Sequence, residues 1–185
     1  MTAQSNYLAG KRTEIHPYKT REGGATVTVF VPYNCLNNCP FCINKAEYEN
    51  PEGFSADKIC ESIRRMDAIT PYCDFVFTGG EPFADLNVLQ QMLDEIPKTH
   101  KVYINTTLPV SKFQTEDDIV RFTEKNKDKI TCINVSRHMQ HYVVESNDDL
   151  LKRLAVPFRI NCVLYKDYPK QDMIPYLERF RLIPG

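Results

Sequence analysis

Three cysteines crowd into one short stretch of this 185-residue chain. The stretch reads CLNNCPFC and places thiols at Cys35, Cys39 and Cys42, a Cys-x3-Cys-x2-Cys spacing. Three thiolates on one loop can bind three corners of a [4Fe–4S] cube and leave one iron without a protein ligand. The spacing therefore predicts an iron–sulfur site with one open coordination position.

Two other uses of these thiols stay open. A structural zinc site normally takes four protein ligands in two separated pairs, which fits a single three-cysteine loop less well. A redox dithiol at Cys39-Pro-Phe-Cys42 is the stronger rival, because thioredoxin-like C-x-x-C motifs also follow a strand. That motif should open a helix, however, whereas NKAEYENPEGF is predicted to continue as a loop, and Cys35 would have no role.

A second motif, Thr78-Gly79-Gly80-Glu81-Pro82, ends an apolar run. Two glycines at a strand edge let a ligand approach the main chain closely, and Glu81 adds a carboxylate suited to a ligand ammonium. An ordinary strand-to-helix turn, with proline near the helix start, would read the same way. The motif becomes informative because it follows the three-cysteine loop by one strand.

The elements that must position these motifs alternate along the chain. Five runs rich in β-branched and aromatic residues predict strands at 26–33, 74–80, 101–107, 129–136 and 158–165. Helical spacing follows predicted caps at Ser55, Asp85, Thr115-x-x-Asp118 and Ser146-x-x-Asp149, and a last helix is expected from about Pro175. The starts at 74, 101, 129 and 158 fall 27, 28 and 29 residues apart, one strand–helix–loop unit each. The predicted fold is an α/β partial barrel of about five to six parallel strands with helices outside.

One parity of each predicted strand is apolar and the other is polar. The polar positions are Thr28, Thr78, Tyr103, Asn105, Thr107, Asn134, Ser136, Arg159, Asn161 and Tyr165. A parallel sheet covered on both faces should be apolar throughout, so this pattern predicts a polar lumen that holds a ligand. The alternative is a lumen filled by hydrogen-bonded polar side chains with no ligand.

The cysteine loop and the glycine motif, in this order on consecutive strands, resemble the radical S-adenosylmethionine (SAM) superfamily. The resemblance covers roughly residues 25–165 in architecture, with specific matches at 35–42 and 79–82. It implies that Cys35, Cys39 and Cys42 hold a [4Fe–4S] cluster whose fourth iron is chelated by SAM. It also implies reductive cleavage of SAM to a 5′-deoxyadenosyl radical that abstracts hydrogen from a substrate, in an oxidoreductase or lyase type of reaction.

The resemblance assigns further residues to the SAM site. Phe41 matches the aromatic residue that precedes the third cysteine and packs near the adenine. The segment that binds the methionine amino group is matched by Gly79, Gly80, Glu81 and Pro82. Ser136 and Arg137 correspond to polar residues at the end of strand four that contact ribose or carboxylate. Apart from the resemblance, the polar parity of the third predicted strand makes Asn105 a further candidate for binding the cofactor or a small polar substrate above it.

Composition narrows the function classes. The chain is 42% hydrophobic and 25% charged, as in globular proteins, and its net charge of −1 gives no strong nucleic-acid signal. No apolar stretch is long enough to span a membrane, and the first 20 residues lack the apolar core of a signal peptide, so a cytoplasmic location is expected.

We expect residues 1–25 to form an N-terminal extension and 26–185 a core that lacks the last βα unit of many family members. Residues 1–25, a second copy or another partner would cover the fifth strand edge. The resemblance implies an external reductant such as flavodoxin or ferredoxin, and we expect a small polar, nucleotide-derived substrate. Three alternatives stay open: an activase that places a glycyl radical on a protein partner, a non-catalytic iron–sulfur or SAM-binding module, and a thiol–disulfide redox protein.

Overall fold

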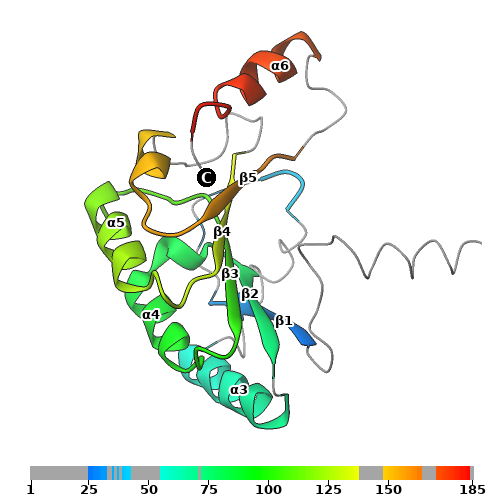
Figure 1. Cartoon of the computed structure of the whole chain (residues 1–185), viewed down its shortest axis with the longest axis vertical. Helices are drawn as coiled ribbons and strands as arrows, with labels where there is room; N and C mark the ends of the chain where they lie inside the picture. Colours follow the sequence, from blue (N-terminus) through cyan, green and yellow to red (C-terminus); the bar gives the residue numbers. More distant parts are fainter. Residues whose placement is uncertain are drawn as a thin grey trace, which may run out of the picture.

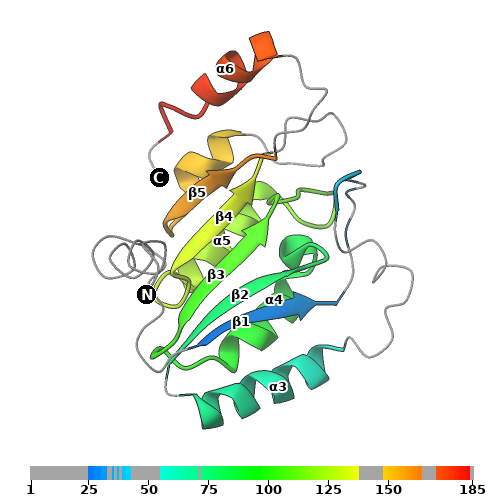
Figure 2. The ribbon, with the colours of Figure 1, turned by 90° about the vertical axis from the view of Figure 1, so that its right-hand side faces the viewer.

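Five parallel strands form one open, curved sheet in the computed structural model of the chain (Figures 1 and 2). The structure describes residues 25–32, 35, 37, 39–42, 55–70, 72–137, 148–163 and 170–183. The strands are β1 (Ala25–Val31), β2 (Cys73–Gly79), β3 (Lys101–Thr106), β4 (Cys132–Ser136) and β5 (Phe158–Asn161). Their order in the sheet is their order in the chain, which confirms the predicted parallel α/β partial barrel.

Three helices cover one face of this sheet, as Figure 2 shows with the strands in front and α4 and α5 behind them. They are α3 (Ala56–Ile69), α4 (Leu86–Asp94) and α5 (Glu116–Lys125). Ser55 and Asp85 cap α3 and α4 through their side chains, and Thr115 forms a reciprocal capping box with Asp118 at α5. These predicted caps are confirmed, because each satisfies backbone N–H groups that have no partner within the helix.

The core lies between the helices and the apolar parity of the strands. Fully buried strand residues on this side are Phe75, Phe77, Val102, Ile104, Ile133 and Val135. On the opposite, concave face, three residues of the predicted polar set, Asn105, Asn134 and Arg159, are joined by hydrogen bonds. The alternation of the strands therefore separates a dry helical side from a polar side, and the polar side borders the functional site.

Several predicted boundaries were wrong. The segment after the predicted cap at Ser146, which lies outside the described residues, is the 3-10 helix η2 (Asp148–Arg153) and not an α-helix. Its buried leucines at 150 and 151, followed by Leu154, fit either helix type, so spacing alone does not separate them.

The last helix also differs from its prediction. Helix α6 (Lys170–Glu178) begins before Pro175 and not at it. Proline removes one backbone donor, here opposite the carbonyl of Gln171, and a helix whose preceding turn is already formed can continue past that loss. Strand β5 ends at Asn161, so Cys162 lies beyond the strand, and Tyr165 lies outside the described residues. None of the described helices is long and apolar enough to cross a membrane.

Candidate functional site

The cysteine loop and the C-terminal ends of β2, β3 and β4 enclose one pocket of about 220 Å³. Its lining residues are Cys35, Asn37, Cys39, Phe41, Cys42, Thr78, Gly79, Gly80, Glu81, Asn105, Thr106, Thr107 and Ser136. Carboxyl ends of parallel strands converge at one edge of a sheet, which is why segments far apart in sequence meet here. Most of the residues assigned to the cofactor from sequence therefore line a single cavity.

The loop makes a tight turn between two of its cysteines. The backbone N–H of Cys42 donates to the carbonyl of Cys39 at 3.1 Å, with Pro40 and Phe41 in the turn. All three cysteines of the loop are partly buried, and the described cysteines form no disulfide. Residues 43–54, where a redox dithiol motif would open a helix, lie outside the described residues.

The three thiols suit an iron–sulfur cluster in ligand type and placement. Thiolate is the ligand of such clusters, and here all three cysteines line one cavity together with polar residues that could hold a further ligand. Within the described ranges, no three His, Cys, Asp or Glu side chains surround a single metal-ion position. Ligands of one tetrahedral ion lie within roughly 4 Å of one another. Thiolates that bind different irons of a cube are farther apart. The lack of three such side chains around one position therefore concerns a site for a single metal ion.

Gly79 ends β2 in a conformation that favours glycine. Its φ is +105°, and a Cβ there would lie 3.1 Å from the backbone nitrogen of Val31 and 3.3 Å from the Cα of Phe30. A side chain would therefore be strained by both the backbone angle and the adjacent strand. Pro82 starts the 3-10 helix η1 (Pro82–Ala84) and is buried, but it borders a separate hollow beside Val31 and not the cysteine pocket.

The carboxylate of Glu81 is buried and accepts four hydrogen bonds. Oε1 accepts from the N–H of Phe83 at 3.0 Å and from the hydroxyl of Thr106. Oε2 accepts from the N–H of Thr107 at 2.8 Å and from its hydroxyl at 2.9 Å. Burial raises the pKa of this carboxyl, while the hydrogen bonds from Thr106, Thr107 and Phe83 act in the opposite direction. Glu81 thus fastens the end of β2 to the end of β3, a role that the sequence did not predict.

Thr107 joins four parts of the site. Besides its two bonds to Glu81, its hydroxyl accepts from Nδ2 of Asn37 in the cysteine loop at 3.2 Å. Its carbonyl accepts from Nη1 of Arg137, beyond the end of β4, at 2.8 Å. The loop, β2, β3 and β4 are therefore held together at this one residue.

Arg137 is completely buried and acts from behind the pocket. Its guanidinium donates to the carbonyls of Thr107 and Ser136, and its Nε lies 3.3 Å from Asp148 at the start of η2. Asp148 also binds Arg179 beyond the end of α6. Burial raises the pKa of Asp148, but the hydrogen bond and charge of Arg179, aided by Arg137, outweigh it and lower that pKa overall. Ser136 lines the pocket, whereas Arg137 is not among its lining residues.

Sequence reasoning missed Asn37 and Thr106 and did not foresee the bonds of Thr107. Asn37 stands inside the Cys-x3-Cys spacing, and two adjacent threonines end the third strand. These positions could have marked the residues as members of the site, because loops and strand ends carry functional residues more often than the interior of the fold does.

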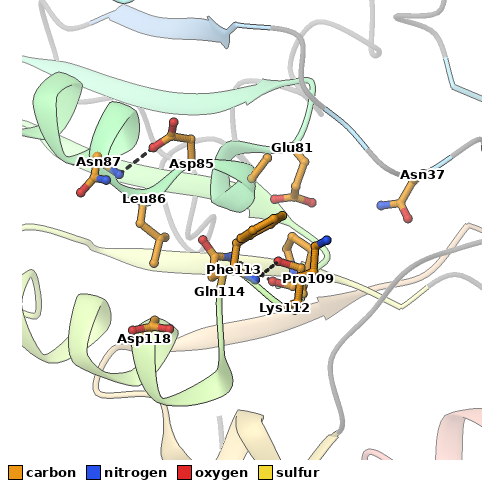
Figure 3. Close-up of a pocket in the computed structure, with 12 residues that line it drawn as sticks. Asn37, Glu81, Asp85, Leu86, Asn87, Pro109, Lys112, Phe113, Gln114 and Asp118 are labelled. Atoms are coloured by element: carbon orange, nitrogen blue, oxygen red, sulfur yellow. Dashed lines mark hydrogen bonds between the residues drawn. The ribbon is translucent and has the colours of Figure 1, made fainter.

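A larger hollow of about 620 Å³ adjoins the cysteine pocket and shares Asn37 and Glu81 with it (Figure 3). It lies between the start of α4 and the segment that precedes α5, with Asp85 and Asn87 on one side and Lys112 and Phe113 on the other. Phe113 is 86% exposed, and the ammonium of Lys112 lies 4.7 Å from the centre of its ring.

Comparison with known proteins gives two kinds of match. A family model described as a 4Fe-4S single cluster domain matches residues 22–151. Solved structures of native anSMEcpe with bound AdoMet and either the Kp18Cys or the Cp18Cys peptide share the fold, each with a TM-score of 0.63 and 18% identity. A histidine-tagged form of anSMEcpe with bound AdoMet gives a TM-score of 0.62 at 17% identity.

These alignments cover 85% of this chain and 48% of the other, so this chain spans about half the length of the structures it matches. At such identities the likeness concerns the fold. No curated protein matches the chain.

Proposed function

We propose, from the premise that this chain belongs to the 4Fe-4S single cluster domain family, that it is a radical SAM enzyme, which binds SAM at its cluster and cleaves it reductively. The observation that carries the proposal is the shared pocket. Three thiols, the Gly79–Gly80 main chain and Ser136 face one cavity at the strand ends. That arrangement puts ligands for a cluster and polar groups for a small cofactor within one enclosure.

Cys35, Cys39 and Cys42 would hold the [4Fe–4S] cluster. When bound, the cluster supplies one electron to the sulfonium of SAM, which leads to C–S cleavage and a 5′-deoxyadenosyl radical that takes hydrogen from a substrate. The protein's task is to fix the loop and to exclude water around it. Asn37 contributes by tying the loop to Thr107, which is itself bound to Glu81.

The remaining residues would orient SAM. The main chain at Gly79 and Gly80 is open to close approach and would accept the methionine ammonium, while Phe41 would pack near the adenine. Glu81 has four donors from the protein, so we assign it to positioning this segment together with Pro82. Ser136 would contact the ribose or the carboxylate, and Arg137 would fix Ser136 through its carbonyl.

The substrate proposed is small and polar, and it would lie on the concave face of the sheet. Support comes from the polar side chains there and from a hollow of about 90 Å³ between Asp74, Tyr103, Asn134 and Arg159. An external reductant such as a flavodoxin or ferredoxin would supply the electron. A reducing compartment such as the cytoplasm suits the cysteine chemistry, and a second copy or another partner would cover the edge of β5.

A second candidate is action on a polypeptide, as in an activase. The exposed ring of Phe113 beside the larger hollow favours it, since exposed aromatic residues are enriched at protein contacts. The two anSMEcpe structures that share this fold also contain peptides. A peptide route would place the substrate against the loop that precedes α5.

The test is anaerobic reconstitution with iron and sulfide, followed by reduction in the presence of SAM. We expect about four irons and four sulfides per chain and release of 5′-deoxyadenosine. Cys39→Ser should lose both, while the control Cys132→Ser, a thiol outside the loop, should keep both. Iron binding without SAM cleavage would indicate a non-catalytic module, and dithiol turnover without iron would indicate a redox protein.

A further inference from the structure

Three polar side chains form a row across the concave face of the sheet. Asn105 of β3 is aligned with Asn134 of β4, and Asn134 is aligned with Arg159 of β5. Nδ2 of Asn134 donates to Oδ1 of Asn105 at 2.6 Å, and Nε of Arg159 donates to Oδ1 of Asn134. The three residues therefore form one continuous chain of hydrogen bonds, which starts at a guanidinium.

The donors and acceptors in this row of hydrogen bonds can be arranged in one order. A guanidinium has donors and no acceptor, so Asn134 must turn its oxygen toward Arg159. Its nitrogen must then face Asn105, which must accept with its own oxygen. Turning either amide over would place N–H against N–H, so this order of donors and acceptors is the one that satisfies all three side chains.

The free end of the row lies at the cysteine pocket. Asn105 lines that pocket, whereas Asn134 is nearly buried and borders the smaller hollow with Arg159. Because the oxygen of Asn105 faces Asn134, its amide nitrogen is the donor that remains for a ligand in the pocket. Within the described part of the chain, that nitrogen has no acceptor. A half-buried donor of this kind suits a ligand that brings an acceptor oxygen.

We propose that the row Arg159–Asn134–Asn105 fixes an N–H donor at the wall of the cysteine pocket, and that this donor binds the carboxylate of SAM. The inference rests on the proposed SAM binding. A carboxylate only accepts hydrogen bonds, whereas a ribose hydroxyl can donate or accept and would tolerate either orientation of Asn105. The amino group of the same ligand only donates, so the row would also prevent SAM from binding with its two charged ends exchanged. Arg159 and Asn134 are positioning residues in this scheme.

Asn134→Asp reverses the row without altering any residue that lines the cysteine pocket. Aspartate accepts from both neighbours, so Asn105 must turn its nitrogen toward position 134 and its oxygen toward the pocket. The dissociation constants of SAM and of its decarboxylated analogue S-adenosyl-3-methylthiopropylamine are measured by anaerobic calorimetry on the cluster-loaded protein. We expect the variant to bind SAM roughly 10- to 100-fold more weakly than wild type, because a hydrogen bond to a charged group is replaced by repulsion. The analogue lacks the carboxylate and should lose less than about threefold.

Asn161→Asp is the matched control for added charge. It places the same negative charge on the same face at β5, aligned with Ser136, without reversing the row. A loss of SAM affinity similar in both variants would overturn the proposal, because charge alone would then explain it. Equal losses for SAM and the analogue in Asn134→Asp would also overturn it.

Iron content and far-UV circular dichroism show whether each variant folds and loads. If Asn134→Asp does not load, Asn105→Asp presents an acceptor directly and must show the same selective loss. If wild-type protein binds and cleaves SAM and Asn134→Asp binds SAM with unchanged affinity, the proposed role of the row is refuted and the proposed function is not. Wild-type protein that binds no SAM refutes the proposed function as well.

Discussion

Glu81 and Thr107 are joined twice at the edge of the sheet. The N–H and the hydroxyl of Thr107 both donate to Oε2 of Glu81, at 2.8 and 2.9 Å. The same hydroxyl accepts from Asn37 of the cysteine loop. Glu81 of the glycine motif is therefore linked to the cysteine loop through Thr107. The cysteine loop is thereby positioned from β3, although the loop follows β1 in the chain.

Thr107→Val keeps the shape of the side chain and removes its hydroxyl. One bond to the buried Glu81 and the bond from Asn37 are lost. We expect a loss of about 1–3 kcal/mol in the free energy of unfolding and faster removal of iron by a chelator. Thr107→Ser keeps the hydroxyl and should remain close to wild type. If the valine and serine variants lose iron at the same rate, the hydroxyl does not hold the loop.

Gly79→Ala tests the strained end of β2. The added Cβ meets the backbone of β1 at 3.1 Å while φ stays at +105°. We expect a destabilisation of about 1–3 kcal/mol in anaerobic urea unfolding. Gly80→Ala is the control, since Gly79 has the only positive φ among the described glycines. Equal stabilities of the two variants would contradict the account of Gly79.

Asp148→Asn removes the acidic partner of a completely buried guanidinium. Arg137 would keep its two carbonyl acceptors but lose its ion pair with Asp148, and Arg179 would lose its ion pair with the same carboxylate. We expect the free energy of unfolding to fall by about 2–4 kcal/mol. The adjacent Asp149 pairs with Lys152 at the surface, so Asp149→Asn should change stability by less than about 0.5 kcal/mol. Similar effects of the two changes would show that burial of Arg137 does not depend on Asp148.

The capping box of α5 should give a measurable pH dependence. Hydrogen bonds from the side chain and backbone of Thr115 lower the pKa of Asp118 to about 2, below its ordinary value of 3.8. Its stabilisation is therefore complete above about pH 4 and is lost as the pH falls toward 2. The stability difference between wild type and Asp118→Asn, measured by urea unfolding, should shrink across that range. A difference that stays constant from pH 5 to pH 2 would show that the carboxylate does not act through its charge.

Local patterns in the sequence predicted most of the fold. The alternation of apolar and polar residues identified the buried side of each strand, for example Phe75 and Phe77. This pattern is visible in the sequence because every second residue of a strand points to the same face. The caps at Ser55 and Thr115 were predictable for the same reason, since their contacts span three residues. The ends of η2 and α6 were not, because their limits depend on packing and not on spacing.

The site divides in the same way. Its cysteines and glycines form local motifs that the sequence displays directly. The bonds from Asn37 to Thr107, from Thr107 to Glu81 and from Arg137 to Thr107 join residues 70, 26 and 30 positions apart. Only the register of the sheet brings such residues together. The sequence therefore predicted that Glu81 binds a ligand, and it did not predict that Glu81 joins the ends of β2 and β3 through hydrogen bonds.

Electron–nuclear double resonance on the reduced, cluster-loaded protein tests the central claim most directly, with SAM labelled by ¹⁵N in its amino group and by ¹⁷O in its carboxylate. We predict hyperfine coupling from both labels in wild type and loss of the cluster signal in Cys35→Ser. A fully loaded cluster without either coupling would mean that no iron is open to SAM, and it would contradict the proposed function.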